Sequence, residues 1–143
     1  MLSTASLDRF QRRRAFAILA VLTNAYVWAS SNDSIASQRI PPAIASPFLE
    51  VAGTCGLNPV VSHAAVVLFN WKRIDPRGPL NLDNIQSVNL FTGSMDEAWF
   101  YLVTVAIELA AVPAIRAIVA AFAAVERKDS AALLAELEVV SGA

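Results

Sequence analysis

The chain contains a single histidine, His63, so any chemistry that needs an imidazole must use this residue. His63 lies in an apolar stretch, SHAAVVLFN, which we expect to be helical and to carry the imidazole inward. Val66 and Val67 follow at spacings of three and four residues, on the same face of an α-helix. Phe100 and Thr104 are one turn apart in a second apolar stretch. If the helix face with His63, Val66 and Val67 lay opposite the face with Phe100 and Thr104, the two faces would form an apolar pocket suited to a flat hydrophobic ligand.

Purely structural roles are the alternative for the same residues. A lone histidine or an aromatic residue at helical spacing is more often part of a hydrophobic core, and a threonine hydroxyl can bond to a carbonyl one turn back. Glu108 continues the face of Thr104 and needs a polar partner, but Arg116 is two turns away. The chain has no hydrolase, kinase, zinc-protease or dinucleotide-binding motif. Spacing alone therefore assigns no catalytic residue and no metal ligand.

The composition excludes several classes of protein. The chain has 143 residues, about one domain, and a net charge of −1, which gives no basic field to attract nucleic acid. It is 56% hydrophobic and 16% charged, which fits a buried helical interior, a large interface or a membrane. The single cysteine, Cys55, excludes an internal disulfide and a cysteine-rich zinc site. A reducing compartment is compatible with this, and we expect a cytoplasmic protein.

The periodicity predicts an all-α fold, because no strand alternation persists. Helices are expected over residues 6–28, 46–55, 58–72, 82–88, 95–125 and 130–140, with a loop over residues 30–44. Ser6 is the expected cap of the first helix, and Asp129 or Ser130 that of the last.

Local signals support the other boundaries. Ser46 followed by Pro47 is typical of a helix start, and Gly56 of a left-handed stop. Ser94 with Glu97 three residues later predicts a capping box. Pro113 predicts a kink or break near the middle of the longest helix.

Two segments favour export or membrane association as an alternative. Arg13-Arg14-Ala15-Phe16 resembles a twin-arginine signal, and the run 99–125 is long enough to span a bilayer. However, Glu108, Pro113 and Arg116 lie near the middle of that run, and ions there are costly. A buried helix of a soluble protein is the better interpretation, and we do not expect a membrane partner.

The run SHAAVVLFNWKRIDPRGPL, residues 62–80, strongly resembles the indoleamine 2,3-dioxygenase family. Members of that family carry a similar helix that ends in Asn-Trp-Lys and is followed by Asp-Pro and Pro-Leu. Supporting matches are AYVW at 25–28, IASPF at 44–48, FYLVT at 100–104, ELAA at 108–111 and AI at 114–115. No single motif is diagnostic, but the order and spacing agree across nearly the whole chain.

The resemblance implies an all-helical haem enzyme that inserts O₂ across the indole 2,3 bond of tryptophan, giving N-formylkynurenine in the kynurenine pathway. His63 matches a distal-pocket position that is often tyrosine, and Val66 and Val67 match neighbouring lining positions. Phe100 matches the aromatic residue that packs on the substrate indole, and Thr104 a distal serine near O₂. Tryptophan or a related indole would be the substrate.

The resemblance also implies what this chain leaves out. The proximal histidine that holds the family's haem iron, and the segment that contacts the substrate carboxylate, would lie beyond Ala143. We therefore expect a truncated chain, inactive alone, that binds haem only when a C-terminal part completes it. Residues 1–91 would correspond to the small domain and residues 92–143 to the start of the large domain. A non-catalytic helical interaction module, folded alone or as a homo-oligomer, and an exported or membrane-associated helical protein are the alternatives.

Overall fold

The computed structural model describes residues 4–29 and 36–142. It divides into two compact units, residues 1–102 and 103–143, and each is described by itself. The predicted all-α class is confirmed, because helices dominate and the described strands form one small two-stranded sheet. The division at residues 91/92, drawn from the family resemblance, stays a prediction.

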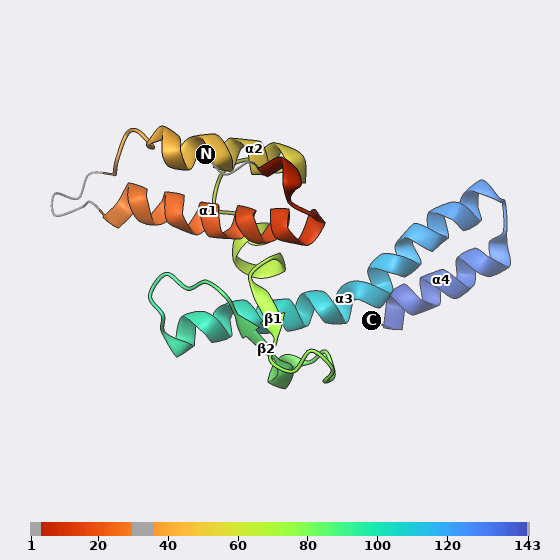
Figure 1. The fold of residues 1–143 in the computed structure, drawn as a ribbon. Helices are drawn as coiled ribbons and strands as arrows, with labels where there is room; N and C mark the ends of the chain where they lie inside the picture. Colours follow the sequence, from red (N-terminus) through yellow and green to blue (C-terminus); the bar gives the residue numbers. More distant parts are fainter. Residues whose placement is uncertain (1–3, 30–35, 143) are drawn as a thin grey trace. The chain divides into compact units, whose positions relative to one another are not determined.

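The core of the first unit lies between two helices, α1 (Arg9–Ala29) and α2 (Pro42–Cys55), which run side by side (Figure 1). Phe16 is fully buried and meets Phe48 with 5.5 Å between ring centroids. Ala20 and Ala52 are also buried, and their small side chains let the helix backbones approach closely. Burial of one such phenylalanine contributes about 1.5–3 kcal/mol to stability.

The start of α1 is held by a capping box at Asp8, whereas the sequence analysis expected the cap at Ser6. Asp8 is the cap: its carboxylate accepts hydrogen bonds from the N–H groups of Phe10 and Gln11, each 2.8 Å long. The side chain of Gln11 in turn accepts the N–H of Asp8 at 2.9 Å. The predicted cap Ser6 lies in a short 3₁₀ turn, η1 (Thr4–Ser6). The prediction was wrong because Asp8 has a glutamine three residues later, and the two side chains satisfy both ends of the box.

Helix α2 begins one turn earlier than the sequence predicted. Pro42 occupies its first turn, so Pro47 lies inside the helix. Pro41, with ψ of 141°, precedes the helix, and Pro42 is tolerated in the first turn because no hydrogen bond is lost there. The predicted loop 30–44 therefore ends before Pro42, and its residues 30–35 lie outside the described part of the chain. The stop at Gly56 is confirmed: its φ is 68°, and the N–H of Leu57 bonds to the carbonyl of Ala52 at 3.0 Å.

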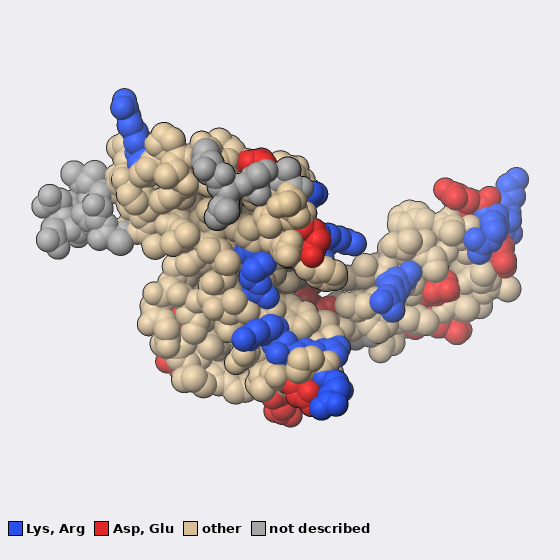
Figure 2. All heavy atoms as spheres, in the orientation of Figure 1, with Lys and Arg blue, Asp and Glu red and all other residues tan. Residues whose placement is uncertain are grey.

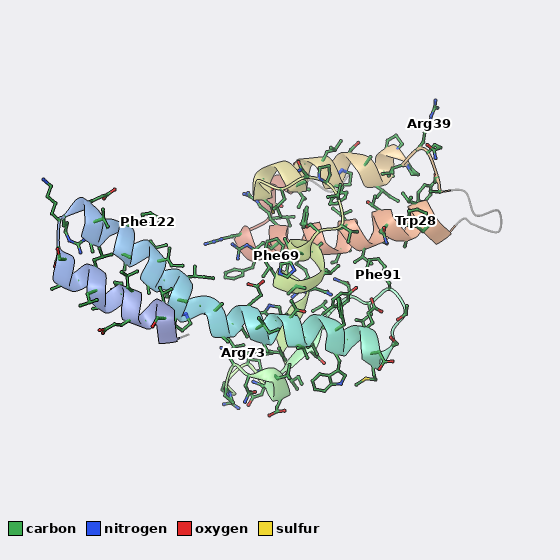
Figure 3. The ribbon with its side chains drawn as sticks, turned by 180° about the vertical axis from the view of Figure 1, so that it is seen from behind. Trp28, Arg39, Phe69, Arg73, Phe91 and Phe122 are labelled. Atoms are coloured by element: carbon green, nitrogen blue, oxygen red, sulfur yellow. The ribbon has the colours of Figure 1, made fainter. Side chains whose placement is uncertain are left out.

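The predicted helix 58–72 is mostly wrong. Only a short turn forms there, the π-helix η2 (Ala64–Leu68), preceded by His63. Its wide turn is shown by the hydrogen bond from the N–H of Phe69 to the carbonyl of Ala64, 2.9 Å long and five residues back. Phe69 packs edge-on against Phe16, with 6.2 Å between centroids, and so fixes η2 to α1 (Figure 3).

A hairpin follows where the sequence predicted the end of one helix and the whole of another. Strand β1 (Trp71–Arg73) pairs antiparallel with β2 (Ile85–Ser87), and Lys72 stands opposite Gln86. Only the 3₁₀ turn η3 (Leu82–Asn84) remains of the predicted helix 82–88. Strands of three residues are too short to show alternation, which is why the sequence did not reveal them.

The loop of this hairpin is organised by one buried side chain, Asn84. Its amide donates to the carbonyls of Asp75 at 2.9 Å and Pro79 at 2.8 Å, and its oxygen accepts the N–H of Asp75 at 2.8 Å. Gly78 lies against this amide, and a Cβ there would approach the nitrogen of Asn84 to 2.7 Å. The position therefore excludes any larger residue unless the loop moves.

The longest helix, α3 (Met95–Glu126), begins in the first unit and ends in the second. Ser94 accepts the N–H of Glu97 at 3.2 Å, which confirms the predicted cap. The helix continues through Pro113, so the predicted break does not occur, while the alternative of a kink there stays a prediction. Of its side chains, only Val105, Ala117 and Ala124 are buried. The expected burial of this helix is wrong for the described chain, since most of its apolar side chains are exposed or half-buried. By length and composition alone, α3 is one helix of the described chain that could cross a membrane.

In the second unit, α4 (Ser130–Gly142) runs back beside the later part of α3 (Figures 1 and 3). Asp129 caps it by accepting the N–H of Ala132 at 3.0 Å, which confirms the first of the two predicted caps. The turn between the helices has the same form as the one at Gly56, with the N–H of Asp129 bonded to the carbonyl of Ala124 at 2.9 Å. Here Lys128 takes the left-handed position, with φ of 56°.

Candidate functional site

The structure places His63, Val66 and Val67 on one short segment, but not on one buried face. His63 is exposed, Val66 is half-buried and Val67 is buried. The expected inward position of the histidine is wrong, because the π-turn that follows it has a wider spacing than the α-helix used in the prediction. Val67 belongs to the interior of the first unit, and His63 is presented on its surface.

Phe100 and Thr104 lie one turn apart on α3, as predicted, on either side of the boundary between the two units. Phe100 is 72% exposed, which is unusual for so large an apolar side chain. Its ring packs edge-on against Tyr101, with 5.8 Å between centroids. Thr104 and Glu108 are half-buried within the second unit. Phe100 therefore presents an aromatic surface that a flat apolar ligand could cover.

The start of α3, which carries Phe100, is fixed by Glu97. Its carboxylate accepts the N–H groups of Phe91 at 2.7 Å and Thr92 at 2.8 Å, the Thr92 hydroxyl at 2.7 Å and the Tyr101 hydroxyl at 3.2 Å. This network extends the predicted capping box, since Glu97 reaches back past Ser94 to the preceding loop.

The electrostatics of this network follow from its hydrogen bonds. Desolvation raises the pKa of Glu97, but the hydrogen bonds from Phe91, Thr92 and Tyr101 together outweigh it, so the pKa lies below its ordinary value. Desolvation raises the pKa of the Tyr101 phenol, and the negative charge and the hydrogen bond of Glu97 raise it further. Glu97 is thus held ionised and Tyr101 neutral, which favours a fixed position for the helix start.

Asn70 is a positioning residue whose role the sequence did not reveal. It is 2% exposed and joins the end of η2 to the segment that follows β2. Its amide donates to the carbonyls of Val66 at 3.2 Å and Asn89 at 2.8 Å, and its oxygen accepts the N–H of Asn89 at 2.8 Å. Nothing in the sequence signals a partner 19 residues away.

The described residues do not form a metal site by themselves. No group of three or more histidine, cysteine, aspartate and glutamate side chains comes together within residues 4–29 and 36–142. A cavity of about 700 Å³ in the first unit lies beside the start of α1. Phe10, Phe69 and Trp71 contribute its aromatic lining and Arg13 and Arg14 its charged lining. His63, Val66, Val67 and Phe100 do not line it, so this cavity is separate from the predicted pocket.

A family model for indoleamine 2,3-dioxygenase matches the chain over residues 1–143. The chain belongs to the indoleamine 2,3-dioxygenase family. Indoleamine 2,3-dioxygenase 1 of Mus musculus is 40% identical over 122 residues, which cover 85% of this chain and 30% of the mouse protein. Indoleamine 2,3-dioxygenase of Saccharomyces cerevisiae is 42% identical over 106 residues, covering 71% of this chain and 23% of the yeast protein. Indoleamine 2,3-dioxygenase 2 of Homo sapiens is 36% identical over 128 residues, covering 90% and 31%.

Membership of the indoleamine 2,3-dioxygenase family confirms the resemblance stated from the sequence. The chain spans less than a third of the length of each of these relatives. The roles assigned to His63, Val66, Val67, Phe100 and Thr104 by resemblance stay predictions.

Proposed function

We propose that this chain forms the distal part of a haem dioxygenase that cleaves the indole ring of tryptophan with O₂ to give N-formylkynurenine. The observation that carries the proposal is the family match over the whole chain, together with the exposed aromatic face of Phe100 at the rigid start of α3. A ring that is 72% exposed yet held by a fixed backbone is suited to pack on a flat substrate.

The residues that the resemblance assigns to the pocket have side chains of the kinds that suit one side of a haem. Val66 and Phe100 are apolar, and His63 and Thr104 carry polar groups. A bound haem would supply O₂ activation at its iron. We assign His63 to the distal side, and the iron ligand to a C-terminal part that corresponds to the rest of the relatives. The chain alone is then expected to be inactive, and we propose a cytoplasmic location.

In this arrangement the side chains of this chain bind and orient the substrate. Phe100 would pack on the indole ring, and Val66 would exclude water from the pocket, with the buried Val67 behind it in the interior of the first unit. Thr104 would place its hydroxyl near the indole N–H. Phe100 therefore contributes through its contact area with the indole. Thr104 contributes a single polar contact, and the reaction does not need Thr104 as a base.

The test combines this chain with the C-terminal remainder of the mouse relative. We expect a Soret band that neither part gives alone and formation of N-formylkynurenine from tryptophan. Phe100→Ala should then reduce kcat/KM at least about tenfold with the Soret band retained, and Thr104→Ala should reduce it less. Phe122→Ala is the matched control, because Phe122 is 69% exposed on the same helix and has no assigned role (Figure 3).

Two results would reject this proposal in different ways. If no Soret band appears with any C-terminal part, the split-enzyme interpretation fails. If the band appears but Phe100→Ala turns over tryptophan as well as Phe122→Ala, the pocket assignment fails while the haem assignment stands.

The exposed apolar side chains of α3 support a second candidate, a non-catalytic helical interaction module. Ile107 is 63% exposed, Val119 67% and Phe122 69%, and such surfaces mark sites where another protein or a membrane packs. Size-exclusion chromatography with light scattering tests this candidate. A homo-oligomer is expected if the module is self-associating, and a clean soluble monomer would contradict it.

A further inference from the structure

The arginine run near the start of α1 is not used by the proposed function. Arg12 and Arg13, with Arg9 one turn earlier, line a cavity of about 380 Å³ between α1, the end of α2 and η2. The other lining residues are Thr54, Cys55, Leu57, Ala64, Leu68 and Phe69. All of them belong to the first unit, and none belongs to the predicted indole pocket.

The positions of these arginines are unfavourable for the helix itself. Arg9, Arg12 and Arg13 are spaced three and four residues apart, so their side chains lie on the same face of α1. Like charges at these spacings repel, and the first turns of a helix carry its positive end. The first turn of α1 contains no acidic residue to offset them. A local arrangement that costs stability in this way is typical of a functional site.

Among the described residues, the cavity itself offers these arginines no counter-charge. Asp8 keeps its charge but directs its carboxylate to the N–H groups of Phe10 and Gln11, and the Glu50 carboxylate accepts the hydroxyl of Thr4. In the part of the chain that the structure describes, no carboxylate lines the cavity. Figure 2 shows Lys and Arg side chains at the end of the unit where α1 begins and, separately, over the hairpin.

Arg12 has a buried donor without a partner among the described residues, and Arg13 is held by an aromatic contact. The Nε of Arg12 is buried and has no hydrogen-bond partner among the described residues. The guanidinium of Arg13 lies 5.2 Å from the centroid of the Phe69 ring, which orients it by a cation–π contact. A buried donor without a partner costs free energy, and an acceptor from a ligand would satisfy it.

We propose that this cavity binds a small anion that carries a carboxylate or a phosphate group. Guanidinium groups match both groups through paired hydrogen bonds, and a volume of about 380 Å³ suits a small ligand. Leu57 and Phe69 give the cavity an apolar side, so an organic anion with an apolar part would fit it as well as inorganic phosphate. The site needs no haem and is separate from the proposed tryptophan site.

Cys55 provides the test, because it lines the cavity and is the only cysteine of the chain. The rate of its alkylation is measured with iodoacetate, which is an anion, and with iodoacetamide, which is neutral and of similar size. In both reactions the thiolate displaces iodide. The fraction of Cys55 that is thiolate therefore cancels when the iodoacetate rate is divided by the iodoacetamide rate. We expect the ratio to exceed that of free N-acetylcysteine by about tenfold or more at low salt, and to fall towards it at 1 M NaCl.

Variants connect this ratio to the arginines. Arg9→Gln should lower the ratio, and Arg9→Gln with Arg12→Gln should bring it close to that of N-acetylcysteine. Arg39→Gln is the matched control: it removes the same charge at the far end of α2, about 20 Å away (Figure 3). The iodoacetamide rate reports whether each variant is folded. Arg9 is exposed and its side chain makes no hydrogen bond in the described chain, so the single variant Arg9→Gln keeps the test valid.

Protection by added anions identifies the ligand group. Inorganic phosphate and benzoate are each titrated against alkylation by iodoacetamide, and the anion that protects at the lower concentration indicates phosphate or carboxylate as the natural group. Protection that disappears in the double variant supports the proposal. A ratio equal to that of N-acetylcysteine, or equal effects of Arg39→Gln and Arg9→Gln, would overturn it.

Discussion

Replacement of Asn70 by alanine should be among the most destabilising single changes in the first unit. The side chain is 2% exposed and makes hydrogen bonds to Val66 and to Asn89, through both its donors and its acceptor. A fourth contact joins its oxygen to the Asn89 amide at 3.1 Å. Alanine removes all of these and leaves three backbone groups of Val66 and Asn89 without their partner.

The expected loss of stability follows from those orphaned groups. A buried donor or acceptor left unsatisfied costs about 1–3 kcal/mol. Asn89 is half-buried, so water can satisfy part of what Asn70 releases, and we expect a total of about 3 kcal/mol. That is a large share of the roughly 5–15 kcal/mol that stabilises a typical domain. At about 3–4 °C for each kcal/mol, the Tm should fall by about 10 °C.

Urea unfolding measures this loss, with circular dichroism reporting the helices and tryptophan fluorescence reporting the region of Trp71. Asn89→Ala is the matched control. It removes the contact at 3.1 Å but keeps the backbone of Asn89 bonded to Asn70, so it should cost only about 1 kcal/mol. Asn70→Asp keeps the acceptor but places a carboxylate against two carbonyl oxygens. It should be as unstable as Asn70→Ala at neutral pH and should recover as the pH falls and the carboxylate is protonated.

Equal losses in Asn70→Ala and Asn89→Ala, or a loss below about 1 kcal/mol in the former, would refute the reasoning. Either result would mean that the carbonyl and N–H groups joined by Asn70 find other partners at little cost. The hairpin would then be held by its strand pairing and not by this side chain.

Further predictions concern helix ends and the core. The pKa of Glu97 lies below its ordinary value of 4.5. The contribution of Glu97 to stability should therefore be complete above pH 4.5 and should be lost as the pH falls through the lower pKa of the folded state. Urea midpoints measured against pH should fall less steeply for Glu97→Gln than for the unchanged chain. Gly56→Ala should destabilise by about 1 kcal/mol because φ is +68°, whereas Gly53→Ala, in the same helix with open space around it, should stabilise slightly; thermal melts that rank them the other way would contradict this. Lys128→Gly should raise the Tm by relieving a φ of 56° at a helix stop, and an unchanged or lower Tm would count against the left-handed strain. Phe16→Ala should cost about 3–5 kcal/mol in urea unfolding, since its ring is fully buried; a loss below about 1 kcal/mol would show that the core collapses around the gap.

Much of the helical framework could be predicted from the sequence, because its helix ends carry local chemical signals. Gly56, Ser94 and Asp129 act at the positions expected of them, and each works through groups within a few residues. Asp8 carried an equally local signal in its pairing with Gln11, and the choice of Ser6 overlooked it.

The region from Asn58 to Ser87 could not be predicted in the same way, since tertiary hydrogen bonds override its helical pattern. Asn70 and Asn84 fix the chain through partners that the sequence does not mark. The candidate site shows the same difference. Phe100 and Thr104 have the predicted helical spacing because α3 is regular there, whereas His63 and Val66 do not because η2 is a π-turn.

The π-turn after His63 also gives the chain a way to change its surface without changing its residues. A π-turn accommodates one residue more than an α-helical turn, as the bond from Phe69 to Ala64 shows. Deletion of one residue within 64–68 would restore regular α-helical bonding and rotate His63 by about 100° around the helix axis relative to Asn70. A one-residue deletion there would therefore turn the imidazole to a new direction while Asn70 keeps its bonds to Asn89, so chains that differ in length at this point would present different walls to the same ligand.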